Sequence, residues 1–254
     1  MSPRSILRQG LSIPHKISSV TARHLTGTIT RVSTQSLAAA LTFDDGPHSE
    51  FTPRVLDILE RYRAHATFFM VGEAAQQYPE VVRRVAEAGH AIGNHSWDHA
   101  SFPFISRQAR LGQIQACHRA TAPYGQRLFR PPYGQQSVAS RFAPFWLGYK
   151  VITWNQEVGD WWDPDARRMA DSLVRRIRPG NIVLLHDALC DHPSADKRPM
   201  VTLSPYPNRE PMLEALTLFL EQTASRFRFV TIPELLRQGY PQKRNWYRVT
   251  PAAG

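Results

Sequence analysis

Short apolar segments of strand length alternate along this chain with longer segments whose apolar residues recur at helical spacing. Residues 38–43 and 66–71 are expected to be buried strands. Between them, Thr52 is the expected N-cap of a helix that places Val55 and Leu59 on one face. This alternation is typical of a parallel sheet whose strands are joined by helices. About seven such units in one chain favour a sheet closed into a barrel. The further expected strands are residues 90–93, 128–129, 149–154, 181–185 and 227–231, and the further expected helices are residues 79–88, 106–120, 136–147, 163–177, 211–223 and 233–237.

The composition fits a single globular α/β domain. The chain has 254 residues, of which 42% are hydrophobic and 20% are charged, which excludes a largely disordered or fibrous protein. Its two cysteines, Cys117 and Cys190, are too few for a disulfide framework or a cysteine-rich zinc module. We expect an N-terminal extension with one strand over residues 1–36, a single domain over residues 37–240, and a C-terminal tail over residues 241–254 with little regular structure.

The charge and hydropathy pattern excludes several classes of partner. The net charge is +10, but the basic residues are dispersed singly or in pairs, so we expect no nucleic-acid partner. No apolar segment approaches the ~20 residues that a membrane-spanning helix needs, and the first thirty residues lack the apolar region of a signal peptide. We therefore expect a cytoplasmic protein by default, with export left open. The sequence predicts no oligomeric state.

Polar or titratable side chains follow directly on five of the expected strands. Chemistry in parallel α/β folds is concentrated where the carboxyl ends of the strands meet. A single polar strand end carries little information, but five along one sheet predict an active site. These residues are Asp44 with Asp45, Asn94 with His95, Arg130, Asn155 and His186.

The carboxylates of Asp44 and Asp45 are adjacent at a strand end, so their side chains point in different directions. One can hold a metal while the other acts as a base, although an ordinary Asp-Gly-Pro turn is the alternative interpretation. His95 and His99 are four residues apart, a spacing that places both imidazoles on one face of a helical turn. With Asp45 they form a set of two histidines and one carboxylate, which is typical of a catalytic zinc site.

Two further segments carry residues that suit hydrolysis. The prolines between Arg130 and Tyr133 stiffen the loop after a strand, so the Tyr133 amide is a candidate oxyanion donor. The Arg130 guanidinium is suited to pair with a carboxylate and keep it ionised. His186 ends another strand, apart from the histidine pair, and suits the role of general acid. A hydrogen-bonded structural histidine is the alternative.

Taken together, these segments resemble the polysaccharide deacetylases of carbohydrate esterase family 4, the NodB-homology group. The resemblance covers about residues 38–238 and implies a distorted (β/α)7 barrel. The matching segments, in chain order, are residues 42–47, 95–99, 130–134, 160–161 and 184–186.

The resemblance implies catalytic roles for four residues. Asp44 would be the general base, oriented and tuned by Arg130. His186 would protonate the leaving group, and Asp160 would support its imidazolium. In related sequences the segment around Asp160 often begins with a further Asp, whereas this chain has Glu157 there and an additional tryptophan, Trp162, after Trp161. This departure puts the shape of the sugar pocket in question.

The resemblance also implies a metal and a substrate pocket. The implied ligands of one divalent metal, most often zinc and sometimes cobalt, nickel or manganese, are Asp45, His95 and His99. The Tyr133 amide would bind the oxyanion, and Trp161 with Leu184 would enclose the acetyl methyl group. The implied activity is hydrolysis of the N-acetyl group of N-acetylhexosamine units in a poly- or oligosaccharide. The alternative is an O-acetyl esterase acting on an acetylated polysaccharide such as xylan.

Overall fold

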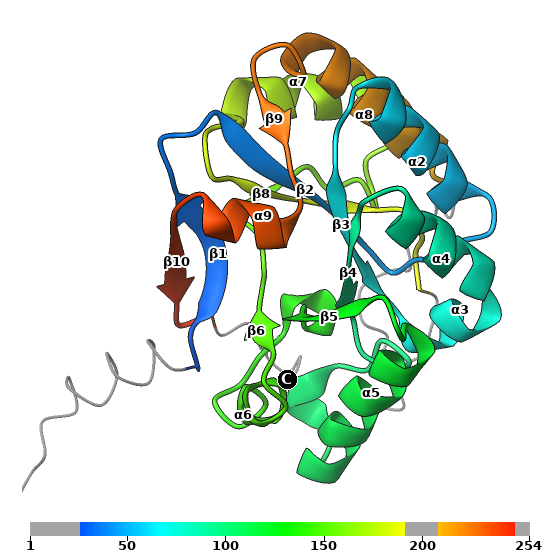
Figure 1. Cartoon of the computed structure of the whole chain (residues 1–254), viewed down its shortest axis with the longest axis vertical. Coiled ribbons are helices and arrows are strands. Elements are labelled where there is room, and N and C mark those ends of the chain that lie inside the picture. Colours follow the sequence, from blue (N-terminus) through cyan, green and yellow to red (C-terminus); the bar gives the residue numbers. More distant parts are fainter. Residues whose placement is uncertain (1–25, 191–207, 247–254) are drawn as a thin grey trace, which may run out of the picture.

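A curled sheet of parallel strands forms the centre of the computed structural model, which describes residues 26–190 and 208–246 (Figure 1). The strand order is β6-β5-β4-β3-β2-β8-β7, with β9 beside the start of β2. This arrangement confirms the expected α/β fold with a distorted (β/α)7 barrel. The bounds are β2 Ala38–Asp44, β3 Ala66–Met70, β4 Ala91–Asn94, β5 Gly125–Phe129, β6 Lys150–Val151, β7 Gln156–Glu157, β8 Ile182–His186 and β9 Arg228–Phe229.

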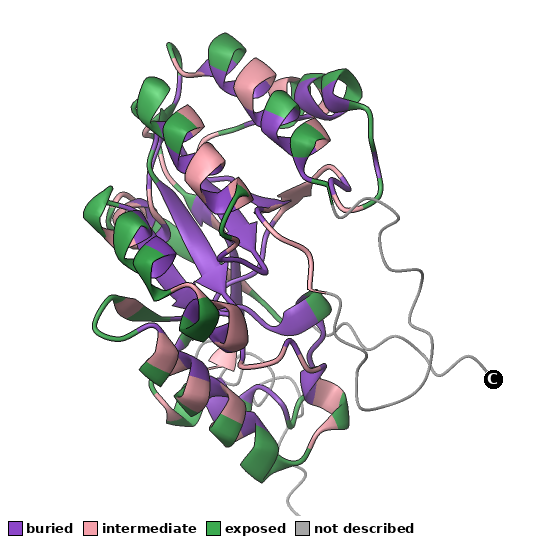
Figure 2. Ribbon diagram, turned by 90° about the vertical axis from the view of Figure 1, so that its right-hand side faces the viewer, coloured by how far each residue is buried: buried purple, intermediate pink, exposed green. Residues whose placement is uncertain are grey.

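Helices cover the outside of the curled sheet, and their outward faces are exposed while their inward faces are buried (Figure 2). No helix within residues 26–190 and 208–246 is long and apolar enough to span a membrane. The helices are α2 Phe51–Arg61, α3 Gly72–Gln77, α4 Pro79–Glu87, α5 Arg107–Ala120, α6 Phe142–Trp146, α7 Ala166–Arg176, α8 Glu210–Thr223 and α9 Ile232–Arg237, with 3₁₀ turns at Phe102–Phe104 and Pro132–Gly134.

Strand β2 lies at the middle of the sheet, and all seven of its residues are buried. Successive strand residues face opposite sides, so Leu41 and Phe43 pack outward in a cluster with residues of α2 and α8. Ala38 and Ala40 face inward and pack with Leu184 and other residues of the barrel interior. Because alternation sends Thr42 and Asp44 to the same inward side, β2 delivers a polar end to the interior of the barrel.

The helix expected over residues 136–147 is much shorter than predicted. Only α6, Phe142–Trp146, is helical. Before it, Ser137 and Ser140 exchange hydrogen bonds between their hydroxyls and each other's backbone amides, at 2.9 and 3.1 Å. Such local side-chain bonds compete with the helical pattern. The strand expected over residues 149–154 is likewise reduced to the two residues of β6.

The residues after Gly239, which we expected to have little regular structure, form strand β10, Tyr240–Arg244. It pairs antiparallel with β1, Thr28–Ser33, outside the main sheet. The sequence of β10 lacks alternating apolar residues, so its conformation comes from pairing with β1 rather than from burial of a face. Residues 1–25 of the expected extension and residues 247–254 of the expected tail lie outside the described part of the chain.

The N-terminus of α2 also differs from the prediction. The helix begins at Phe51, so Thr52 lies in its first turn and does not cap it. The Thr52 hydroxyl instead donates to Oδ2 of Asp187 at 2.5 Å and accepts a hydrogen bond from the His48 amide at 2.7 Å. Thr52 therefore connects the start of α2 to the residue that follows β8.

Candidate active site

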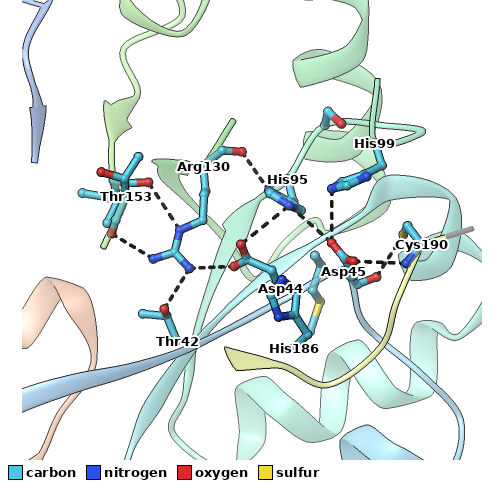
Figure 3. A network of polar contacts seen from close by, with 12 residues as sticks. Thr42, Asp44, Asp45, His95, His99, Arg130, Thr153, His186 and Cys190 are labelled. Atoms are coloured by element: carbon cyan, nitrogen blue, oxygen red, sulfur yellow. Dashed lines mark hydrogen bonds and ion pairs between the residues drawn. The ribbon is translucent and has the colours of Figure 1, made fainter. Parts of the chain in front are cut away.

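Side chains from four strand ends meet at one edge of the sheet (Figure 3). Asp44 ends β2 and His186 ends β8, and these two strands pair with Asp44 beside His186 in register. His95 and Arg130 directly follow β4 and β5. Asn155, the fifth strand-end residue predicted from the sequence, instead bonds with its side chain and amide to the backbone of Ile182.

Asp45, His95 and His99 lie together, with their ligand atoms within 4.8 Å of one another and all three residues buried. Oδ1 of Asp45 is 3.4 Å from Nε2 of His95 and 3.3 Å from Nε2 of His99. The Nδ1 atom of His95 lies 2.8 Å from the Arg130 carbonyl oxygen, which turns Nε2 toward Asp45. The two histidines are not on a helical turn, as their spacing suggested. They lie on a loop in which Ser96 and His99 have positive φ values of 71° and 60°.

This donor set fits a divalent metal ion. Oδ1 of Asp45 is buried and accepts no hydrogen bond from the residues that the structure describes. A buried carboxylate oxygen without a donor is costly unless a cation compensates it. Burial raises the pKa of Asp45, but His99, His95 and His186 outweigh that effect and hold it well below its usual range. Burial lowers the pKa of His99 to about 4, so its imidazole is in the neutral form that binds metals.

The carboxylate of Asp44 is held by Arg130. Its Oδ1 accepts a hydrogen bond from Nη1 of Arg130 at 2.7 Å, and both side chains are almost fully buried. Arg130 also donates to the hydroxyl of Thr42 at 2.8 Å and to the carbonyl of Thr153 at 3.1 Å. Its guanidinium lies 4.1 Å from the ring centroid of Phe69. These contacts fix the orientation of the Asp44 carboxylate, whose other oxygen lies 3.7 Å from Nε2 of His95.

The imidazole of His186 is held by Asp160. Oδ1 of Asp160 lies 3.1 Å from Nδ1 of His186, and Oδ2 accepts the His186 amide at 2.9 Å. Burial alone would lower the pKa of His186, but the carboxylates of Asp160, Asp45 and Asp44 together outweigh that effect and raise the pKa to about 9. His186 is therefore protonated at neutral pH, and its Nε2 atom carries a proton on the side away from Asp160.

The residues expected to contact substrate surround these pairs. The Trp161 ring lies 5.4 Å from that of His186, nearly perpendicular to it. Leu184 is buried in the barrel interior on the same side of β8 as His186. Tyr133 has a positive φ of 57°, and its partly exposed ring lies 4.3 Å from that of His99. Glu157, the departure noted in the sequence, accepts a hydrogen bond from Nε1 of Trp154 at 2.6 Å.

Two buried charged residues near the site were missed by the sequence analysis. Asp187 directly follows His186, and burial raises the pKa of its carboxyl to about 7. Its position two residues after the expected strand 181–185, next to His186, was a signal for it. Arg209 precedes α8 and contacts Asp160. No motif in the sequence distinguished Arg209 from the other arginines.

Comparisons with known proteins agree with this geometry. The profile of the family described as "Polysaccharide deacetylase" matches residues 31–152. A peptidoglycan-N-acetylglucosamine deacetylase of Bacillus cereus is 34% identical over 203 residues, which are 78% of this chain and 87% of that protein. A chitooligosaccharide deacetylase of Azorhizobium caulinodans is 34% identical over 165 residues, which are 63% of this chain and 79% of that protein.

The fold is also similar to that of solved structures. A crystal structure of the Bc1960 peptidoglycan N-acetylglucosamine deacetylase superimposes with a TM-score of 0.71 at 26% identity, covering 84% of this chain and 94% of that one. A structure of the peptidoglycan deacetylase PdaC from Bacillus subtilis gives a TM-score of 0.68 at 28% identity, covering 81% and 93% of the two chains. The predicted resemblance is confirmed, and the chain belongs to the polysaccharide deacetylase family.

Proposed function

We propose that this protein is a metal-dependent hydrolase that removes the N-acetyl group from N-acetylhexosamine units of a poly- or oligosaccharide. One observation carries the proposal: the buried Asp45–His95–His99 cluster lies beside both a held carboxylate, Asp44, and a held imidazolium, His186, which are neighbours in register at the ends of β2 and β8. A base and an acid placed around a metal site suit the hydrolysis of an amide. The names of the relatives, which are deacetylases of peptidoglycan and chitooligosaccharides, support the substrate class.

Asp45, His95 and His99 are the residues that would hold the metal, for which zinc is the first candidate and cobalt, nickel or manganese are alternatives. When bound, such an ion supplies Lewis-acid polarisation of the acetyl carbonyl oxygen. The two nitrogen donors and one carboxylate oxygen leave coordination positions for a small ligand and match catalytic zinc sites.

The chain's own residues move the protons. Asp44 takes a proton from the attacking water as the water oxygen bonds to the acetyl carbon, while Arg130 holds the carboxylate in its orientation. The Tyr133 amide donates to the oxyanion of the tetrahedral intermediate. His186 then gives its Nε2 proton to the sugar nitrogen as the carbon–nitrogen bond breaks. Acetate and a free amino sugar are the products.

The walls of the pocket select the acyl group. Trp161 stands against the His186 ring, and Leu184 lies two residues before it on the same side of the strand. We propose that these two side chains enclose the acetyl methyl group and exclude longer acyl chains. All of the residues in this mechanism fall within residues 37–240, the range proposed for the catalytic domain.

Acetate release by the zinc-loaded protein from N-acetylglucosamine oligomers tests the proposal, with Asp44→Asn as the matched control. We expect the wild type to release acetate and the variant to release almost none while it keeps its metal. Release from acetylated xylan but not from the oligomers would contradict the proposal and favour the O-acetyl esterase. Equal release by the wild type and Asp44→Asn would contradict the role of Asp44.

A further inference from the structure

Arg209 is a buried cation beside the acidic half of the site. It immediately precedes α8, its side chain is 1% exposed, and it is among the largest fully buried side chains of the described residues, together with Arg130. Burying a guanidinium is unfavourable unless a carboxylate and hydrogen bonds compensate it. Arg209 does not reach the substrate surface, so any contribution to the reaction passes through the groups that it contacts.

The contacts that bear on the site are made to Asp160, besides a hydrogen bond from Nη2 of Arg209 to the carbonyl oxygen of Asn208 at 3.3 Å. Nη2 of Arg209 donates to the carbonyl oxygen of Asp160 at 3.0 Å, and Nη1 lies 3.5 Å from its Oδ2. Asp160 in turn holds both the amide and the ring nitrogen Nδ1 of His186. The three side chains form a chain of alternating charge, Arg209–Asp160–His186, and the first two members are almost completely buried.

From this geometry, and relying on the proposed function, we propose that Arg209 is a positioning residue that makes His186 a better proton donor. Before the reaction, Asp160 is compensated by both the His186 imidazolium and Arg209. After His186 gives up its proton, Arg209 is the one cationic side chain of the described residues that still lies within 4.0 Å of the buried carboxylate. The arginine thus stabilises the state that follows proton transfer more than the state that precedes it.

The arrangement resembles the one around the base, where Arg130 holds the Asp44 carboxylate. Both carboxylates, Asp44 at the end of β2 and Asp160 three residues after β7, are therefore paired with a buried arginine. The two pairs differ in what the carboxylate does: Asp44 contacts the reacting water, whereas Asp160 acts only through His186. Removing Arg209 should consequently change the acidity of His186 and leave metal binding intact.

The effect has a definite sign. Without Arg209, the negative charge of Asp160 acts on His186 uncompensated, so the pKa of His186 rises and its proton is held more tightly. Within the part of the chain that the structure describes, the charged groups that act on His186 are Asp44, Asp45, His99 and Asp160, and Arg209 acts through Asp160. All of these except Arg209 are unchanged in the test. We expect kcat to fall about 10- to 100-fold, as is typical for supporting residues, with KM unchanged.

The test compares R209M and R209K with a matched control, R54M. Arg54 pairs with Glu210, the first residue of α8, but at the exposed surface. Two quantities are measured on the zinc-loaded proteins: kcat and KM for acetate release across pH, and the titration of the His186 ring by NMR. The His186 signal is assigned by comparison with H186A. Metal content is measured for each variant.

The expected result for R209M is a lower kcat, an alkaline limb shifted to higher pH, a higher pKa of His186 and normal metal content. R209K should keep the wild-type pKa of His186, because it retains the charge, and recover part of kcat. R54M should match the wild type. In a D160N background, R209M should produce no further shift of the alkaline limb, since the coupling passes through Asp160.

A lower kcat in R209M with an unchanged titration of His186 would show that Arg209 has a structural role and does not change the acidity of His186. That result would overturn the proposal. If R209M does not fold, R209K carries the test, and a changed His186 titration in R209K would contradict the role of the charge. If the wild type releases no acetate, the proposed function fails, but the NMR titration still tests the coupling between Arg209 and His186.

Discussion

Replacing Arg130 by methionine should lower the free energy of unfolding by about 3–5 kcal/mol, the usual cost of breaking a buried ion pair by removing one partner. The structure explains why the cost falls in this range. The Asp44 side chain is only 3% exposed, so little water can replace the guanidinium as a partner for its charge. The carbonyl of Thr153 and the hydroxyl of Thr42 also lose their donors.

A double-mutant cycle with Asp44→Asn separates the ion pair from the packing of the arginine stem. Each single variant leaves one buried charge without its partner, whereas the double variant leaves neither. We therefore expect the double variant to be more stable than the sum of the single losses predicts, by about 1–3 kcal/mol. The surface pair Arg84–Asp57, with side chains 51% and 60% exposed, is the matched control, and its cycle should show less than about 1 kcal/mol.

Urea unfolding followed by tryptophan fluorescence measures these free energies. Excess chelator is present throughout, so that a bound metal does not compensate Asp44 in one variant and not in another. Additive losses from Arg130→Met and Asp44→Asn, within about 0.5 kcal/mol, would refute the argument that the buried charges stabilise one another. A loss below about 1 kcal/mol for Arg130→Met alone would refute it as well.

Asp44→Asn should keep a full complement of metal and lose nearly all acetate release, and a variant that retains normal turnover would exclude Asp44 as the base. His95→Ala should lose both metal and activity, and elemental analysis showing one metal per chain would remove His95 from the ligand set. Acetate release should decline as pH rises through about 9, where His186 loses the proton that it donates, and a constant rate up to pH 10.5 would contradict its role as the acid. Burial holds the pKa of His90 at about 4, below its ordinary 6.5, so the unfolded chain binds a proton that the folded chain rejects, and the free energy of unfolding should fall as pH drops from 6.5 toward 4. His90→Gln should flatten that slope in urea unfolding at several pH values.

The central strands of the fold were predictable because their physical signal is local. Strand β2 is a largely apolar run, with Thr42 as its one polar residue before Asp44, and the carboxylates of Asp44 and Asp45 mark its end. Such a run bounded by polar residues indicates a buried strand. The same applies to β3 and β8. The alternation with helices predicts the parallel arrangement, which in turn predicts that Asp44 and His186 lie at the same edge of the sheet.

The less regular parts depended on contacts that no local pattern encodes. Strand β10 forms because it pairs antiparallel with β1. Its own sequence shows no alternation of apolar and polar residues. The loop that brings His95 and His99 together has positive φ angles at Ser96 and His99. Serine and histidine at these positions do not by themselves predict that conformation. The closeness of these two histidines was thus predicted from a helical geometry that the structure does not have.

Arg209 shows a further limit. A buried arginine is recognised by the carboxylate that it meets, and Asp160 is 49 residues away in the sequence. Its neighbour Glu210 is exposed and pairs at the surface, so the two charged residues look equivalent in sequence but lie in opposite environments.

The position of β2 between β3 and β8 also has a consequence for how the chain folds. Thr42 bonds to the carbonyl of Val183, 141 residues later, so one edge of β2 has no partner until most of the polypeptide has been made. During synthesis, the edge of β2 that pairs with β8 stays exposed until β8 has been made. An exposed, unpaired strand edge slows folding and favours aggregation. The three proposed metal ligands, by contrast, lie within strands β2 to β4 and the loops that follow them, which emerge consecutively. A nascent chain that extends past His99 but has not reached β8 therefore contains every proposed metal ligand but lacks His186, the proposed proton donor.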